Sequence, residues 1–303
     1  MTPEKGERRF SDQKHAQGGW RTRRARGTGP VRAFANFLSY KRKGVHDLAA
    51  DGSREWLVLD CGCGNGAYTS WFLQRCPCTI LSLDWSIQAL RTLSHPKKGK
   101  VFRMCADIQM LPIKSQRCDA LFTIDTLGHV RDQRKAFDEM LRVLKANAPV
   151  FLHSECGNYK LRWPDTMLRR KLGYDYLAGI DGHISLPFHA ELHRMLLRRF
   201  NVVKFFSPAG LLGWIIGYPE KYYLAFREAH CRIMQSVTAA SALIKRLPIL
   251  GACMRFVNTL SNRLELFLGI DGGGSCFAVL RTPGENPDTI GAGASTGNSE
   301  VVP

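Results

Sequence analysis

The sequence predicts an α/β protein built around a doubly wound sheet, and three observations lead to this fold class. First, five short apolar runs between residues 57 and 153 alternate with segments of helical character, which is the pattern of βαβ units. Second, the first apolar run leads directly into a glycine-rich turn and a helix. Third, acidic side chains follow the apolar runs, and open α/β sheets bind ligands at the carboxyl ends of their strands.

The glycine-rich turn lies within Trp56–Thr69, where four apolar residues indicate a buried strand. Gly62, Gly64 and Gly66 let the backbone turn tightly and let a ligand approach without an intervening Cβ atom. The helix that begins near Ala67 offers unpaired N–H groups to an anionic part of a ligand. A cofactor is therefore expected at this turn.

Two cofactor classes fit the turn. The spacing Gly62-x-Gly64-x-x-Ala67 matches the dinucleotide-binding fingerprint with alanine in its last position. The spacing Asp60-x-Gly62-x-Gly64-x-Gly66, in which an acid closes the strand, resembles the first motif of the class I S-adenosylmethionine-dependent methyltransferases. In that family the glycines pass under the methionine part of the cofactor. The residues expected to bind the cofactor here are Asp60, Gly62, Cys63, Gly64 and Gly66.

The second strand, Thr79–Leu83, is followed by Asp84, about 20 residues beyond the glycines. Its carboxylate can accept hydrogen bonds from both ribose hydroxyls, which either cofactor class carries. Trp85 is expected to flank the adenine, and Ser86 is a good N-cap for the helix that follows.

The third strand, Val101–Met104, leads into Asp107-Ile108 and then Leu111-Pro112. This order resembles the methyltransferase segment with an acid followed by Leu-Pro. The resemblance implies that Asp107 bonds the adenine amino group and that Ile108 packs on the ring. A dinucleotide enzyme has no need of this element, although an acid in a surface turn would look the same.

The fourth strand, Cys118–Ile124, ends at Asp125, which we expect to bind the cofactor at the carboxyl edge of the sheet. His129 follows in the same loop and is a candidate general base, because the pKa of a free histidine lies near neutrality. The alternative is that His129 only shapes the loop.

The helix from about Asp132 to Lys145 carries the sequence Glu139-Met-Leu-Arg-Val-Leu-Lys145, which closely resembles a methyltransferase helix. The usual Pro-Gly-Gly is replaced, but Asn147 can still adopt the left-handed conformation of the turn. Over residues 56–154 the chain is identified as a member of the class I S-adenosylmethionine-dependent methyltransferases, most similar to the small-molecule and quinone methyltransferase group. The resemblance implies a three-layer Rossmann-like sheet of seven strands with the last antiparallel, and S-adenosyl-L-methionine as cofactor.

The second half of the chain must supply the acceptor site. Glu155, just beyond strand five, and His183 are candidate catalytic residues there. Tyr159 to Tyr176 are expected to form an irregular, aromatic-rich stretch that covers an acceptor or packs on the sheet. Tyr40, in the segment before the first strand, is a candidate pocket residue.

The predicted organisation has five parts. An unusual feature is the length of chain between strand six, Asn201–Phe206, and the final strand, where two or three helices could form a cap, a dimer surface or an interfacial membrane contact. The parts are a basic tail without fixed structure (1–30), a methyltransferase core with N-terminal lid helices (31–206), a helical insertion (207–274), the final core strand (275–282) and a disordered tail (283–303).

The net charge and the cysteine content indicate which cellular location and which binding partners to expect. The net charge is +17, and residues 1–43 hold twelve Lys/Arg against three Asp/Glu. This basic segment could bind nucleic acid or an anionic membrane, or serve only solubility. Ten scattered cysteines and no apolar leader predict a reduced, cytoplasmic location, with peripheral membrane contact as an alternative. No metal site is expected, because Cys61-x-Cys63 and Cys76-x-Cys78 lack zinc spacing.

The sequence thus predicts an enzyme that methylates a small-molecule or lipid-like acceptor. An RNA (tRNA) methyltransferase aided by the basic tail is one alternative, although no RNA-binding motif is visible. A non-catalytic binding module with a methyltransferase fold is another.

Overall fold

The computed structural model describes residues 11–14, 16, 40–93, 98–157, 163–208, 210–268, 270 and 274–284 of the 303-residue chain. A seven-stranded sheet in the order β3-β2-β1-β4-β5-β7-β6 forms its centre. β1 to β5 pair in parallel, and β7 runs antiparallel to both of its neighbours. The strands are β1 (Leu57–Cys61), β2 (Thr79–Asp84), β3 (Lys100–Cys105), β4 (Ala120–Ile124), β5 (Pro149–Glu155), β6 (Asn201–Phe206) and β7 (Ser275–Arg281).

Helices follow the strands as the alternating pattern predicts. Ser86 and Asp132 cap their helices by accepting hydrogen bonds from backbone N–H groups three residues on. The core helices are α3 (Tyr40–Ala50), α4 (Ala67–Arg75), α5 (Ile87–Thr92), the 3₁₀ turn η1 (Leu127–His129), α6 (Gln133–Val143), α7 (Trp163–Leu172), α8 (Tyr176–Asp181) and α9 (His189–Leu197).

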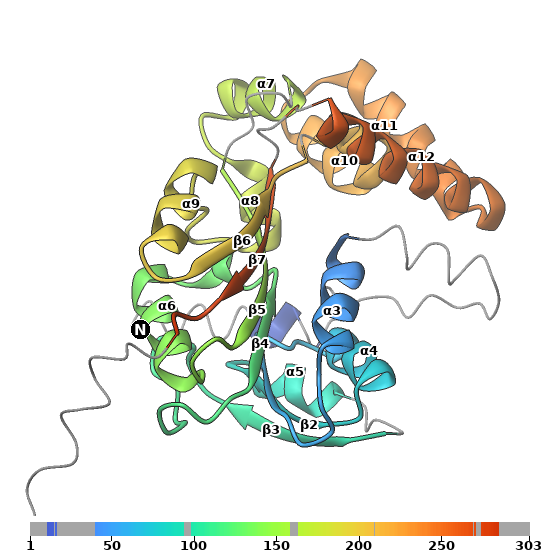
Figure 1. Cartoon of the computed structure of the whole chain (residues 1–303). Helices are drawn as coiled ribbons and strands as arrows, with labels where there is room; N and C mark the ends of the chain where they lie inside the picture. Colours follow the sequence, from blue (N-terminus) through green and yellow to red (C-terminus); the bar gives the residue numbers. More distant parts are fainter. Residues whose placement is uncertain are drawn as a thin grey trace, which may run out of the picture.

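The sheet is covered on both faces, which gives three layers (Figure 1). Alternate residues of β1 point to opposite sides, so Leu59 and Cys61 join one core cluster and Val58 the other. The first cluster packs α6 and α9 against the sheet, and the second packs α3 and α4. Because both faces are buried, the central strands are mainly apolar.

An insertion between β6 and β7 lies beyond the carboxyl ends of the parallel strands (Figure 1). It consists of the one-turn π-helix η2 (Gly213–Gly217) and the helices α10 (Pro219–Glu228), α11 (Arg232–Arg246) and α12 (Pro248–Phe267). Among the described residues, no single helix is long and apolar enough to cross a membrane; α11 and α12 meet the criterion only together and are bent by 114° at their junction.

The predicted fold class is confirmed: the sheet has seven strands, the last is antiparallel, and a helical insertion separates β6 from β7. The stretch around Tyr174 and Tyr176 differs from the irregular loop that we expected. It contains α7 and α8, and α8 is defined by an Asp175 N-cap and by Gly182, which ends it with φ +75°. Tyr159 lies outside the described residues.

The N-terminal segment also differs from expectation in one short part. Residues 11–14 are helical, although we expected a tail without fixed structure over 1–30. The Asp12 carboxylate accepts hydrogen bonds from the Ser86 hydroxyl at 2.6 Å and from the Gln88 N–H at 3.4 Å. Lys14 donates to the Ile180 carbonyl at 3.1 Å. These contacts join α5 to α8 across the region of the cofactor turn.

Gly44 determines how closely α3 packs on the sheet, and replacing it with alanine tests this. A Cβ atom there would lie 2.0 Å from the Phe151 ring, so α3 must move away. Gly44→Ala is expected to lower the free energy of unfolding by about 1–3 kcal/mol, as overpacking typically does. Chemical denaturation measures this.

The matched control is Gly179→Ala in α8, where a Cβ atom would meet nothing within 4 Å. That variant should retain or slightly increase stability, because alanine favours helix more than glycine does. Equal stability of the two variants would contradict the packing argument.

Candidate active site

The glycine turn is shaped by contacts that exclude larger side chains. Gly62 and Gly66 have φ of +74° and +73°, in the left-handed region that favours glycine. A Cβ atom on Gly62 would lie 2.1 Å from Thr126 Oγ1, and one on Gly66 would lie 2.6 Å from Leu93 Cγ. The Gly62 and Cys63 N–H groups donate to the Leu83 carbonyl at 2.8 and 2.9 Å. The turn is therefore attached to the end of β2.

Asp84 makes the second attachment. Its Oδ2 accepts a hydrogen bond from the Gly64 N–H at 2.9 Å, and its Oδ1 accepts one from the Ser86 N–H at 2.9 Å. Each carboxylate oxygen can accept more than one hydrogen bond, and Asp84 lines the cavity described next. The carboxylate is thus oriented before any ligand arrives.

A cavity of about 740 Å³ lies over this turn, a volume within the usual range for cofactor sites. Most of the residues predicted to bind the cofactor line it. They are Gly62, Cys63, Gly64, Asp84, Trp85, Asp107, Ile108 and Asp125.

Asp60 and Gly66 are not among the lining residues. The Asp60 side chain is 3% exposed and accepts a hydrogen bond from the Thr69 hydroxyl of α4. Burial raises the pKa of Asp60 to about 7, and the nearby Asp84 carboxylate acts in the same direction. Asp60 therefore stabilises the turn without lining the cavity, because its hydrogen bond with Thr69 connects the end of β1 to α4.

Asp125 lies where α3, β4 and β5 meet. Its carboxylate is 2.6 Å from Lys41 Nζ and 2.7 Å from His153 Nδ1. Desolvation acts to raise the pKa of Asp125, but the Lys41 ammonium and His153 outweigh it and hold the pKa well below its usual range. Asp125 is therefore an anion at any physiological pH. Its ion pair with Lys41 connects the end of β4 to α3.

The three candidate catalytic residues come together beside the cavity. His183 Nε2 lies 3.2 Å from Glu155 Oε2, and the rings of His129 and His183 are 4.9 Å apart between centroids. Burial, together with the neighbouring His183, lowers the pKa of His129 to about 4. His129 Nδ1–H donates to the Gly182 carbonyl at 3.1 Å, so Nε2 is the acceptor nitrogen of this neutral ring.

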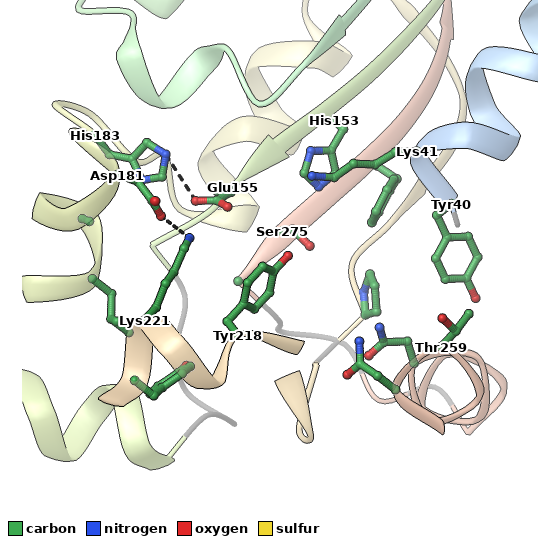
Figure 2. A pocket seen from close by; sticks show the side chains of 18 residues that line it. Tyr40, Lys41, His153, Glu155, Asp181, His183, Tyr218, Lys221, Thr259 and Ser275 are labelled. Atoms are coloured by element: carbon green, nitrogen blue, oxygen red, sulfur yellow. Dashed lines mark hydrogen bonds and ion pairs between the residues drawn. The ribbon is translucent and has the colours of Figure 1, made fainter. Parts of the chain in front are cut away.

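Figure 2 shows the residues that line a second cavity, of about 340 Å³. Its walls come from α3, α8, α10, α12 and the ends of β5 and β7. Six residues line both cavities: Lys41, Glu155, Asp181, His183, Tyr218 and Lys221. The two cavities are therefore neighbours, and the wall between them consists of ionisable side chains.

Several of these residues were not found from the sequence. Tyr40 was a pocket candidate and lines the second cavity, but Lys41 stands in a run of basic residues that looks like a solvated surface. Asp181, Tyr218 and Lys221 come from α8 and the insertion, far from any motif. No local signal distinguishes them, because only the folded chain brings α3, α8 and α10 to one place.

Glu155, Asp181 and His183 also place three potential metal-ligand atoms within 4.8 Å of one another. The Lys221 ammonium pairs with Asp181, so a cation already neutralises this carboxylate. The three side chains are thus held in place by the His183–Glu155 contact and by the Asp181–Lys221 ion pair.

Comparison with known proteins identifies the domain to which the central part of the chain belongs. Residues 59–152 match the family model described as "Methyltransferase domain". These residues form a methyltransferase domain. The resemblance to the class I S-adenosylmethionine-dependent methyltransferases that the sequence predicted is therefore confirmed over residues 59–152.

The curated relatives match only part of this chain. An uncharacterized protein of Methanocaldococcus jannaschii is 38% identical over 112 residues, which are 37% of this chain and 46% of that protein. The malonyl-[acyl-carrier protein] O-methyltransferase of Hamiltonella defensa is 28% identical over 158 residues, 49% of this chain and 58% of that protein. The chain thus matches about half the length of these relatives.

Over most of its length, the chain has a fold similar to that of solved structures. The putative sarcosine dimethylglycine methyltransferase from Galdieria sulphuraria superposes with a TM-score of 0.51 at 13% identity, over 92% of this chain and 98% of that one. A chain from the complex between the Haloferax volcanii Trm112 methyltransferase activator and a putative methyltransferase gives 0.52 at 13% identity, over 90% and 97%.

The elevated pKa of Asp60 predicts how stability depends on pH. A carboxyl group with a folded pKa above its unfolded value of 3.8 contributes stability below that pH, and loses it as the pH rises through about 7. Asp60→Asn cannot ionise but can still accept from Thr69. Relative to the wild type, its melting temperature, followed by calorimetry, should therefore rise progressively between about pH 4 and pH 7 and then level off. A difference that stays constant with pH would contradict this burial of Asp60.

Proposed function

We propose that the protein transfers the methyl group of S-adenosyl-L-methionine to a small-molecule or lipid-like acceptor bound in the 340 Å³ cavity. The observation that carries this proposal is the direct junction between the two cavities, with the His183–Glu155 pair at the junction. The cofactor would supply an electrophilic methyl group. The protein then needs to align an acceptor atom with that group and remove its proton.

The residues of the larger cavity fit this cofactor. Asp84 presents carboxylate oxygens suited to a ribose, and Asp107 and Ile108 line the same cavity as Trp85, as the adenine contacts require. Asp125 also lines this cavity, where the Lys41 ammonium at 2.6 Å compensates its charge and holds its carboxylate in place. Eight of the ten residues that the family resemblance implies line this one cavity, which supports the proposal.

The acceptor site contains groups that a polar acceptor would satisfy. Within the described residues, the side-chain oxygens of Asn258 and Asn262 are buried and have no hydrogen-bond partner, and both residues line the second cavity. Buried amide oxygens without a partner cost free energy. An acceptor with hydroxyl or amine donors would satisfy them, so we propose that it carries such groups.

His183 is the proposed general base. The Glu155 carboxylate next to Nε2 favours a proton on that nitrogen, which leaves Nδ1 to accept a proton from the acceptor. Gly128 permits this placement, because a Cβ atom there would lie 2.6 Å from the His183 ring. The new bond joins the acceptor atom to the methyl carbon, the carbon–sulfur bond breaks, and S-adenosylhomocysteine leaves as the neutral thioether.

Calorimetric titration with S-adenosylmethionine, S-adenosylhomocysteine and NAD tests the cofactor. The wild type should bind the first two. Asp84→Asn should bind them at least tenfold more weakly, because hydrogen bonds to a charged group contribute about 1.5–3 kcal/mol. The matched control is Asp138→Asn, a surface residue paired with Arg199, which should bind as the wild type does. Binding of NAD alone, or full affinity in a folded Asp84→Asn variant, would refute the proposal.

Transfer of labelled methyl groups to a lipid extract, and separately to total tRNA, tests the base and the acceptor class. His183→Gln should lower incorporation into lipid-soluble product by about 10²–10⁴-fold while cofactor affinity stays within a few-fold. Gly128→Ala should act in the same direction by displacing the ring. The control is His193→Gln, whose ring stacks on Phe205 away from both cavities. Incorporation into tRNA alone would favour the RNA alternative, for which residues 1–43 remain the predicted contact.

A further inference from the structure

We infer that the exposed face of the α11–α12 pair docks onto an anionic lipid surface. The two helices project from the domain beyond the carboxyl edge of the sheet (Figure 1). α11 packs against α10, and α12 packs against η2 and α11. Their other sides carry large apolar side chains in contact with solvent.

On α11 these side chains recur at helical spacing. Ile233, Val237 and Ile244 lie at intervals of four and seven residues, so they share one side of the helix. Leu243 is exposed beside them. The buried residues of the same helix, Thr238 and Ser241, are small and polar. The usual arrangement of a surface helix is thus reversed.

α12 continues the pattern. Ile249, Phe256, Leu260, Leu264 and Phe267 are exposed and fall on one side of the helix. Ile249 is 78% exposed and Phe267 is 86% exposed. The junction between the helices is also apolar, because Leu247 and Leu250 are exposed next to Ile249. An exposed apolar surface of this extent marks an interaction site.

The charges on the pair decide which partner fits. Between residues 229 and 268 the only acidic residue is Glu265, and it is buried, where it accepts hydrogen bonds from the Gly210 and Leu211 N–H groups. Arg232, Arg246 and Arg255 are exposed. The exposed charges carried by the two helices themselves are thus basic, and exposed apolar side chains together with basic residues are the composition of helices that lie on anionic membranes. On the neighbouring helix α10, the acidic Glu220 is paired with Lys245 of α11. A second copy of the same surface would instead bring like charges together.

The bend between the helices fits contact with a surface. A 114° change of direction at Leu247–Pro248 prevents the pair from forming one continuous span and presents the apolar junction at its tip. Leucine and isoleucine at this tip can enter the boundary between headgroups and acyl chains, while the arginines contact the headgroups.

The opposite side of α12 faces the second cavity, which Asn258, Thr259 and Asn262 line. One helix therefore has a polar side at the proposed acceptor site and an apolar side for the membrane. Docking is independent of the proposed activity; the consequence that the acceptor arrives from the bilayer rests on the proposed function.

Vesicle sedimentation of the full chain tests the inference. We expect binding to phosphatidylcholine vesicles that contain phosphatidylglycerol, and weak binding to phosphatidylcholine alone. Leu247→Ser/Ile249→Ser should lower the partition coefficient more than tenfold, because each side chain loses favourable transfer from water. Arg246→Gln/Arg255→Gln should lower it about fivefold for each arginine. The matched control is Met110→Ser/Val203→Ser, which alters two exposed apolar residues elsewhere and should bind as the wild type does.

Three results would overturn the docking surface. The first is no binding of the wild type to the anionic vesicles. The second is binding that Leu247→Ser/Ile249→Ser leaves unchanged, which would place the contact elsewhere on the chain. The third is a lipid-free dimer, detected by sedimentation velocity, that the same variant converts to a monomer. Titration of each variant with S-adenosylmethionine keeps this test separate from that of the proposed function, since cofactor affinity should remain unchanged.

Discussion

The site depends most on the two hydrogen bonds that the Asp84 carboxylate accepts. It holds the Gly64 N–H and the Ser86 N–H at the same time, so the glycine turn and the start of α5 have a fixed relation to the end of β2. Gly62 and Gly66 then bring the turn close to Thr126 and Leu93. A single side chain thereby positions the turn of β1, the helix after β2 and its own acceptor oxygens.

A second constraint links the cofactor cavity to the acceptor cavity. The Lys41–Asp125 ion pair, with the buried His153 ring beside it, joins α3 to the ends of β4 and β5. Lys221 and Asp181 form another at the boundary with α8 and α10. These pairs place fixed charges along the wall that both cavities share. Residues from the insertion therefore complete a site that begins at the carboxyl ends of the parallel strands.

The sequence predicted the parts of the site that belong to short, continuous segments. The glycine turn, Asp84 and the Asp107–Ile108 segment each follow a strand directly, so their place at the carboxyl edge follows from the parallel sheet. His129, Glu155 and His183 were predicted individually, and the structure brings them together. Asp60 was expected to contact the cofactor, but its side chain turns away from the cavity because Thr69 provides a buried partner.

The remainder could not be predicted, because it depends on contacts between distant segments. Lys41 and Asp125 are 84 residues apart, and nothing in a run of three basic residues marks the one that turns inward. The short helices α7 and α8 depend on caps and on packing against α10, where local propensity is weak. The reversed polarity of α11 is visible only when its packed side is known, since apolar spacing alone indicates a buried face.

The measurement that tests the central claim most directly is a crystal structure with S-adenosylhomocysteine bound. We predict that the ligand occupies the 740 Å³ cavity, with its ribose hydroxyls on Asp84 and its sulfur facing His183 and the second cavity. A ligand bound elsewhere, or one whose sulfur faces away from the second cavity, would contradict it.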